Sequence, residues 1–345
     1  MDIYNLEYNQ LIEELKANNI ASFRAKQIWN WLYVNLVNSF DEMTNLDKKT
    51  IDFLKTNYKL EPLNVIKQQK AKDETEKILS KLKDGETIET VLMKFDYGYS
   101  VCVTTQIGCK IGCSFCASHL GGFKRNLETA EIVKQIIFFA QRLKKIEKRV
   151  SHVVIMGIGE PLDNLENVFS FINIINDQNG LKIGARHITL STSGIVPKFD
   201  DIINYDKQIN LAISLHASDN ETRSRIMKIN NVYNIEQIIN ATKKYIEKTN
   251  RRVSFEYILL KNINDREKDA NNLVNLLRGI NCHVNLIPFN VIEEYDYQTS
   301  NHQTINHFYE ILKQQNIQVS IRNSKGQDID GACGQLRRKS QNDQL

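Results

Sequence analysis

The sequence predicts an α/β protein in which a small helical module precedes a parallel sheet that is covered by helices and is either open or closed into a barrel. Two observations support this fold class. From residue 101 onward, short apolar runs alternate with amphipathic stretches of helical length. In residues 8–57, by contrast, the apolar side chains recur at helical spacing. The 345 residues suffice for about two domains, and they contain no tandem repeat.

The first 60 residues are expected to form the helical module. Their apolar positions lie three or four residues apart, and Ser22 is the expected N-cap of the second helix. These positions are Leu11, Ile12, Leu15, Ala25, Ile28, Trp29, Leu32 and Tyr33. Residues 61–94 are expected to be a linker and a β-hairpin, because two strand-like runs in "KILSKLKDGETIETVLMKF" flank Asp84 and Gly85.

The core is expected over residues 95–330, and residues 331–345 follow as a C-terminal tail. Helix-like stretches such as "AEIVKQIIFFAQRLKKI" and "EQIINATKKYIEKTN" separate its apolar runs. These runs are "VCVTTQ", "HVVIMGI", "HITLST", "INLAISLH", "VSFEYILL", "HVNLIPF" and "IQVSIR". Because a helical crossover returns the chain to the same end of the sheet, repeated units of this kind place their strands in parallel.

Composition narrows the setting without identifying a partner. Hydrophobic residues make up 41% of the chain and charged residues 25%, as in an ordinary soluble protein. The N-terminus lacks the pattern of a secretory signal, and no apolar run approaches the roughly 18 residues of a membrane span. We therefore expect a cytoplasmic protein whose cysteines stay reduced. The net charge of +4 permits a nucleic-acid partner but does not demonstrate one.

Three of the six cysteines lie in "GCKIGCSFCASHLGG", directly after the first strand of the core. The carboxyl end of a strand is where barrels and open α/β sheets place their chemistry. An iron–sulfur cubane has four irons, so ligation by Cys109, Cys113 and Cys116 alone leaves one iron open to an exogenous ligand. Zinc is an alternative, because His119 completes a Cys₃His set.

The same loop resembles the signature of radical S-adenosylmethionine (SAM) enzymes, with Phe115 as the aromatic residue before the last cysteine. Five further motifs resemble, in order and spacing, the RlmN family of adenine-C2 RNA methyltransferases. They are "MGIGEPLDN", "RHITLSTSGIVP", "AISLHA", "VNLIPFN" and "DIDGACGQL". The resemblance covers nearly the whole chain. It implies a radical SAM partial (β/α)₆-type barrel behind the N-terminal helical module.

The resemblance implies a [4Fe–4S] cluster on the three loop cysteines and SAM as the second cofactor. It assigns to SAM the residues Gly159, Glu160, Ser191, Ser214, Leu215, His216 and Asn290. Each has a structural alternative when it is considered alone. Gly159 and Glu160 could form a βα turn with a helix cap, and Ser191 or His216 could be a satisfied polar residue of the core. A functional role is favoured because several strand ends converge.

The resemblance also assigns the catalytic residues Glu89, Cys102 and Cys333. Adenine C2 is electron-poor and cannot attack the SAM methyl group, whereas a thiolate can, so Cys333 would carry the methyl group as S-methylcysteine. A radical formed on that group would add to C2, Glu89 would accept a proton, and Cys102 would release the product through a transient disulfide with Cys333. Considered alone, Cys333 reads as an inert thiol and Glu89 as a solvent-facing strand residue. Cys282 matches no functional position and is expected in the core.

By resemblance, the substrates are the peptidyl-transferase-centre adenine of 23S rRNA and an anticodon-loop adenine of tRNA. The electron donor would be a flavodoxin or a ferredoxin, and the enzyme a monomer. Lys124, Arg125 and the basic cluster 337–339 are the expected RNA contacts. Gly331 departs from the family, which usually has Ala there, and glycine is expected to loosen the tail.

Two other functions remain as alternatives. One is a Cfr-type adenine-C8 methyltransferase, although Pro161 favours the RlmN family because Cfr-type sequences tend to have Ala there. The other is a non-catalytic RNA-binding protein stabilised by zinc.

Overall fold

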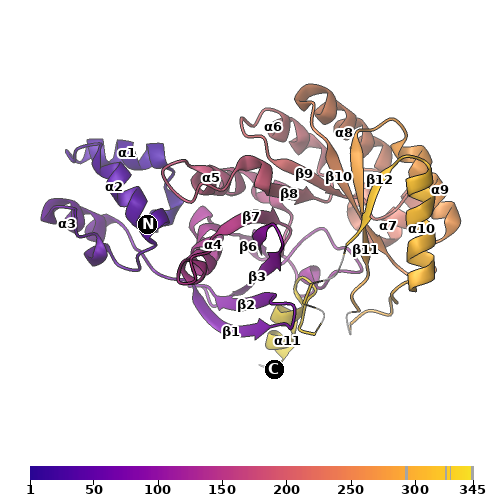
Figure 1. Ribbon diagram of the computed structural model, residues 1–345, viewed down its shortest axis with the longest axis horizontal. Helices are drawn as coiled ribbons and strands as arrows, with labels where there is room; N and C mark the ends of the chain where they lie inside the picture. Colours follow the sequence, from indigo (N-terminus) through magenta and orange to yellow (C-terminus); the bar gives the residue numbers. More distant parts are fainter. Residues whose placement is uncertain (292–293, 323–324, 327, 343–345) are drawn as a thin grey trace.

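The centre of the protein is a ten-stranded mixed sheet, seen in a computed structural model that describes residues 1–291, 294–322, 325–326 and 328–342 (Figure 1). The strands lie in the order β1-β2-β3-β4-β7-β8-β9-β10-β11-β12. Their bounds are β1 (Asn64–Lys70), β2 (Glu76–Lys81), β3 (Thr87–Phe95), β4 (Gly98–Cys102), β7 (Val150–Ile155), β8 (Ile188–Thr192), β9 (Asn210–Ser214), β10 (Val253–Leu259), β11 (Cys282–Pro288) and β12 (Gln318–Ile321).

Every neighbouring pair from β4 to β12 is parallel, and the seven strands of this part are the seven apolar runs of the sequence. Among the described residues β12 pairs only with β11, so the barrel stays open on that side. The expected partial β/α barrel is therefore confirmed. Strands β1 to β4 continue the same sheet in antiparallel pairs, including the hairpin at Asp84 and Gly85.

Helices cover the outer face of the parallel strands, with α4, α5, α6, α8, α9 and α10 around the barrel (Figure 1). They bury apolar faces because their hydrophobic residues recur at helical spacing. The bounds of these helices are α4 (Thr129–Lys144), α5 (Leu165–Asn176), α6 (Phe199–Ile203), α8 (Ile235–Thr249), α9 (Glu267–Leu277) and α10 (His302–Gln314), and the short helix α7 (Asn220–Ile226) precedes α8. No helix among the described residues is both long and apolar enough to cross a membrane.

The N-terminal module contains α1 (Tyr8–Ala17), α2 (Arg24–Asn30) and α3 (Lys48–Asn57), as the sequence predicts. Trp29 and Tyr33 are almost fully buried, and their rings pack at a tilt with the centroids 4.4 Å apart. The Asn5 side chain accepts a 2.8 Å hydrogen bond from the backbone N–H of Ala130, at the start of α4. The prediction for Ser22 is wrong, because Phe23 is the N-cap residue and Ser22 accepts only through its backbone carbonyl.

The tail returns to the antiparallel part of the sheet. It passes Cys333 and ends in α11 (Gln335–Asn342), which contacts β3 and the short turn Ala117–His119 of the cysteine loop (Figure 1). The last three residues of the predicted tail, 343–345, lie outside the described residues. A segment far along the chain is thereby placed next to the hairpin that precedes the barrel.

Candidate active site

A cavity of about 340 Å³ lies at the carboxyl ends of the parallel strands. Eleven of the thirteen predicted site residues line it, which confirms that the strand ends converge. These are Cys102, Cys109, Cys113, Cys116, Gly159, Glu160, Ser191, Ser214, His216, Asn290 and Cys333. The other two, Glu89 and Leu215, are not among the lining residues.

The cysteine loop spans the short strands β5 (Gln106–Ile107) and β6 (Arg125–Asn126), which pair with each other. Gly108 has a φ of +76°, and a Cβ there would lie 1.7 Å from the carbonyl oxygen of Gly122, so only glycine fits. On the far side of the loop, the backbone N–H of Ser114 donates to the carbonyl of Ile226 over 2.9 Å. The loop is thus closed on itself and anchored to the end of α7.

The three loop thiols share one wall of the cavity, where burial raises the pKa of each. The pKa of Cys109 is raised to about 12, first by burial and then by the neighbouring charge of Cys116. Such thiols stay protonated at neutral pH unless a cation compensates for the charge of the thiolate. A multi-iron cluster would supply that compensation, because metal ions deprotonate the thiols that bind them. The donor set therefore fits a cluster held by three cysteines.

The zinc alternative finds no support in the geometry. In the part of the chain that the structure describes, no group of three or more His, Cys, Asp or Glu side chains could hold one metal ion. His119 instead places Nδ1 2.8 Å from the carbonyl oxygen of Cys116 and stacks on Tyr295. A zinc site gathers all its ligands around a single ion. A cubane can bind each thiolate through a different iron, so its ligands need not be so close together.

Glu160 lines the cavity, and hydrogen bonds from neighbouring residues fix both of its carboxylate oxygens. It is 3% exposed, and its Oε2 accepts hydrogen bonds from the backbone N–H and the hydroxyl of Ser193, each at 2.7 Å. Its Oε1 accepts from the backbone N–H of Leu162, so the predicted helix cap is also correct. Burial raises the pKa of Glu160, and the hydrogen bonds from Ser193 act in the opposite direction. Sequence reasoning missed Ser193, although it is the second serine of the "STSG" motif.

Arg223 is a second residue that sequence reasoning missed, and it joins the ends of β8 and β9. Its guanidinium is fully buried and donates to the carbonyl oxygens of Ser193, Ser214 and Leu215 at 2.7, 3.2 and 3.0 Å. The side chain of Leu215 packs in the core, so this residue can offer only its backbone to a ligand. The available signal was an arginine a few residues after "SLHA".

His216 lines the cavity in a strained backbone conformation. Its φ of +59° lies in the left-handed region, and its Nδ1 accepts a 3.0 Å hydrogen bond from the backbone N–H of Ile258. The ring meets Phe115 edge-on, with centroids 5.0 Å apart. Burial, reinforced by the charge of Arg223, lowers the pKa of His216 to about 3. The imidazole is therefore neutral at physiological pH.

Cys102 and Cys333 approach the cavity from segments 231 positions apart. The Cys333 sulfur lies 3.5 Å from the carbonyl oxygen of Met156. The Cys102 thiol also forms a hydrogen bond with the backbone of Met156. Cys333 is exposed where it borders the cavity, yet enough protein surrounds its thiol to raise its pKa to about 12. Cys282 is 7% exposed and belongs to the core, as predicted.

Glu89 is not a solvent-facing strand residue, because it is 4% exposed. Its two carboxylate oxygens accept hydrogen bonds from the backbone N–H groups of Gly334 and Arg337, at 2.9 and 2.6 Å. Glu89 therefore contacts the tail immediately beyond Cys333 rather than the cavity itself. This placement could not be read from sequence, because it depends on how the tail folds back.

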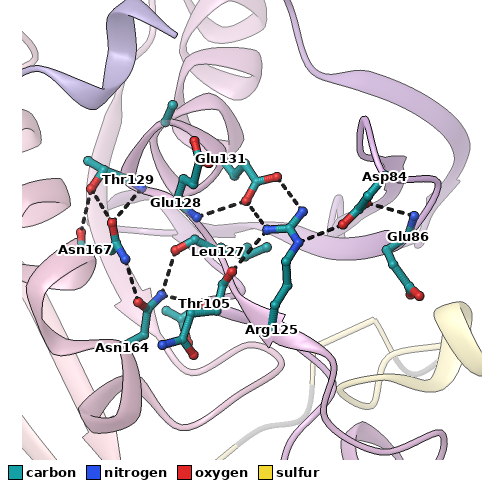
Figure 2. A network of polar contacts seen from close by, with 12 residues as sticks. Asp84, Glu86, Thr105, Arg125, Leu127, Glu128, Thr129, Glu131, Asn164 and Asn167 are labelled. Atoms are coloured by element: carbon teal, nitrogen blue, oxygen red, sulfur yellow. Dashed lines mark hydrogen bonds and ion pairs between the residues drawn. The ribbon is translucent and has the colours of Figure 1, made fainter. Parts of the chain in front are cut away.

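A network of polar side chains around Asn164 connects the two ends of the cysteine loop to the segment after Glu160 (Figure 2). Asn164 donates to the carbonyl oxygens of Thr105 and Leu127 at 2.9 and 2.8 Å, and it accepts from Asn167. These bonds connect the segment that follows Glu160 to the strands on either side of the cysteine loop. The two flanks of the cavity are thereby held in a fixed relation.

The same network engages a residue that the sequence assigned to RNA. Arg125 forms ion pairs with Asp84 and Glu131, both at 2.7 Å (Figure 2). In the tail, Arg337 is 4% exposed and donates to Glu86 over 3.1 Å. The expectation that these two arginines contact RNA is therefore not supported, since their guanidinium groups have partners within the protein.

Comparison with known proteins gives consistent matches along the chain. Residues 1–60 match the ribosomal RNA large subunit methyltransferase N-terminal domain, and residues 103–274 match the radical SAM superfamily. Proteins described as probable dual-specificity RNA methyltransferase RlmN, from Staphylococcus aureus strains JH9 and Newman, are 52% identical over 98% of this chain and 93% of their own length. The crystal structure of a radical SAM methyltransferase from Sphaerobacter thermophilus superposes with a TM-score of 0.93 at 40% identity, covering 97% of this chain and 98% of that chain.

Proposed function

Because the chain belongs to the RlmN family of radical SAM RNA methyltransferases, we propose that it methylates C2 of adenine in 23S rRNA and in tRNA. The targets would be the peptidyl-transferase-centre adenine and an anticodon-loop adenine. The observation that carries the proposal is that Cys102 and Cys333 border the same cavity as the three loop cysteines. A methyl carrier, a releasing thiol and a cluster would then share one enclosure, as the proposed chemistry requires.

The cofactor sites follow from the lining residues. Cys109, Cys113 and Cys116 would hold a [4Fe–4S] cluster, which together with bound SAM supplies the methyl group and the one-electron chemistry. The remaining wall would hold SAM through the strand-end residues Gly159, Glu160, Ser191, Ser214, His216 and Asn290. Neutral His216 can offer its Nε2–H to an acceptor, because Nδ1 already accepts from Ile258. Leu215 would contribute only its backbone.

The chain's own groups would divide the remaining work. The Cys333 thiol must lose its proton before it can accept a methyl group, and the protein around the thiol, which raises its pKa, opposes that loss. Glu89 would accept a proton from the adenine adduct, which requires it to exchange the amides of Gly334 and Arg337 for the substrate. The Cys102 thiolate would then attack the Cys333 sulfur. The new S–S bond takes the place of the S–C bond to the product, and the electron pair leaves with the product carbon.

The test compares variants of the three isolated cysteines. Cys333→Ala is expected to form no product and no adduct, because nothing remains to accept the methyl group. Cys102→Ala is expected to leave RNA covalently bound through Cys333, which is visible as a shifted band on a denaturing gel. Cys282→Ala is the control and should turn over normally, since Cys282 lies in the core away from the cavity.

The outcome can contradict the proposal in two ways. Normal turnover by Cys102→Ala without a trapped adduct would refute the division of labour between the cysteines. Nucleoside chromatography of the modified RNA that shows mainly 8-methyladenosine would instead support the Cfr-type reaction.

We further propose that the enzyme acts as a monomer with a flavodoxin or a ferredoxin as electron donor.

A further inference from the structure

One buried lysine in the antiparallel part of the sheet has no role in the reaction described so far. Lys77 on β2 is 1% exposed. A fully buried ammonium group is costly unless anions and hydrogen-bond acceptors surround it. The groups that surround Lys77 therefore indicate why the position is charged.

The acceptors of Lys77 come from two places. On the neighbouring strand β3, Oε2 of Glu89 lies 3.0 Å from the Lys77 Nζ. In the tail, the carbonyl oxygens of Asp330 and Ala332 lie 2.5 and 2.7 Å away. Ammonium has three donors, and these three acceptors match them. Two of the acceptors thus lie just before Cys333, one and three positions upstream of it.

Glu89 completes the enclosure on the other side of Cys333. Its carboxylate accepts from the backbone N–H of Gly334 and of Arg337, as described above. Lys77 therefore binds carbonyls upstream of the cysteine, Glu89 binds amides downstream of it, and the two side chains form an ion pair between them. A charged pair on two adjacent strands thus fixes the backbone on both sides of one thiol.

We propose that Lys77 is a positioning residue for Cys333, holding the tail on β2 and β3 so that the thiol faces the cavity. Gly331, which was expected to loosen the tail, instead lets two tail segments approach closely, since a Cβ there would lie 2.6 Å from the carbonyl oxygen of Gly326. We call the ion pair of Lys77 and Glu89, together with its hydrogen bonds to the tail, the clamp. The clamp also joins Cys333, the proposed methyl carrier, to Glu89, the proposed proton acceptor. The significance of the clamp rests on the proposed function, but its existence does not.

The test measures how fast iodoacetamide alkylates Cys333, by site-resolved mass spectrometry of the full-length protein. The rate constant is taken from the unmethylated Cys333 peptide, so prior methylation does not affect it. Lys77→Met is expected to raise this rate at least tenfold, because the released thiol leaves the surroundings that raise its pKa. Lys77→Arg, which retains the charge, should restore part of the protection. Lys94→Met is the matched control and should change nothing, since it breaks only the exposed pair with Glu74 on the same antiparallel sheet.

Cys282 reports global unfolding within the same experiment. It is buried in the core, so local release of the tail leaves it protected, whereas general unfolding exposes both cysteines. If Lys77→Met unfolds the protein, Glu89→Gln is used instead, because glutamine has nearly the same shape as glutamate but no charge. The alkylation rate of Cys333 is expected to rise at least tenfold in this variant too.

An unchanged Cys333 rate in a folded variant would overturn the proposal. A slower rate would also overturn it, because the tail would then have stayed in place and lost only the nearby charge that favours the thiolate. Neither measurement requires turnover. Failure of the clamp and failure of the proposed methyl transfer are therefore distinguishable.

Discussion

Replacing His216 by Asn should remove a defined part of the acid sensitivity of this protein. Asn tolerates the left-handed conformation that His216 adopts, with its φ of +59°. Its side-chain oxygen can also accept the hydrogen bond that Ile258 donates to the imidazole. The substitution therefore preserves the backbone and one contact while it removes the only titratable group at the position.

The magnitude follows from the difference between the folded and unfolded states. In the folded protein the pKa of His216 is lowered to about 3, whereas in the unfolded chain it is about 6.5. Below pH 6.5 the unfolded chain therefore binds a proton that the folded protein does not. Stability from this group is present above pH 6.5 and is lost as the pH falls towards 3. At pH 5 the loss is about 2 kcal/mol, and at pH 8 it is close to zero.

The assay is urea unfolding of wild type and His216→Asn at pH 8 and pH 5. The variant will have a lower free energy of unfolding at pH 8, because it lacks the ring contact with Phe115. That loss is the same at both pH values, and all other groups titrate in both proteins. The quantity to compare is the change from pH 8 to pH 5, which should be smaller in the variant by about 2 kcal/mol. An equal change in both proteins would refute the neutral, buried imidazole.

Two further substitutions test the framework of the site. Gly108→Ala should abolish cluster binding, measured as iron per chain, because a Cβ would lie 1.7 Å from the carbonyl oxygen of Gly122; Gly85→Ala, which has a φ of +87° and open space, is the control that should keep its iron. Asn164→Ala should lower the free energy of unfolding by about 1–3 kcal/mol, because buried carbonyls lose their donor. The control is Asn57→Ala, because the exposed Asn57 side chain donates only to Phe53 within α3. It should change the free energy of unfolding by less than about 0.5 kcal/mol. Equal effects of the two asparagine substitutions would contradict the role of the network.

Features that depend on short stretches of sequence could be predicted. The seven parallel strands are continuous apolar runs because both faces of such a strand are buried. The cysteine loop was recognisable because ligands for one cluster lie within eight residues of each other. Cys282 could be assigned to the core for the same local reason, since it begins an apolar strand and matches no motif.

Local pattern was less informative where a polar side chain has two possible partners. Ser22 had the right chemistry for a helix cap, but α2 begins at Arg24 and Phe23 occupies the N-cap position without a side-chain cap. Arg125 had the charge expected of an RNA contact, yet Asp84 and Glu131 bind it from two separate elements. A charge in the sequence does not reveal whether an internal carboxylate will be brought close enough to pair with it.

The order of motifs along the chain was enough to predict the family, the barrel and the cysteines that face its cavity, because each motif is a short stretch that can be recognised without knowing the fold. Only the tertiary structure revealed that Lys77 and Glu89 enclose Cys333, a contact between segments about 250 positions apart. No periodicity or spacing encodes such a contact. It arises because the tail folds back onto β2 and β3, where a buried ammonium and a buried carboxylate satisfy the backbone groups on both sides of the thiol.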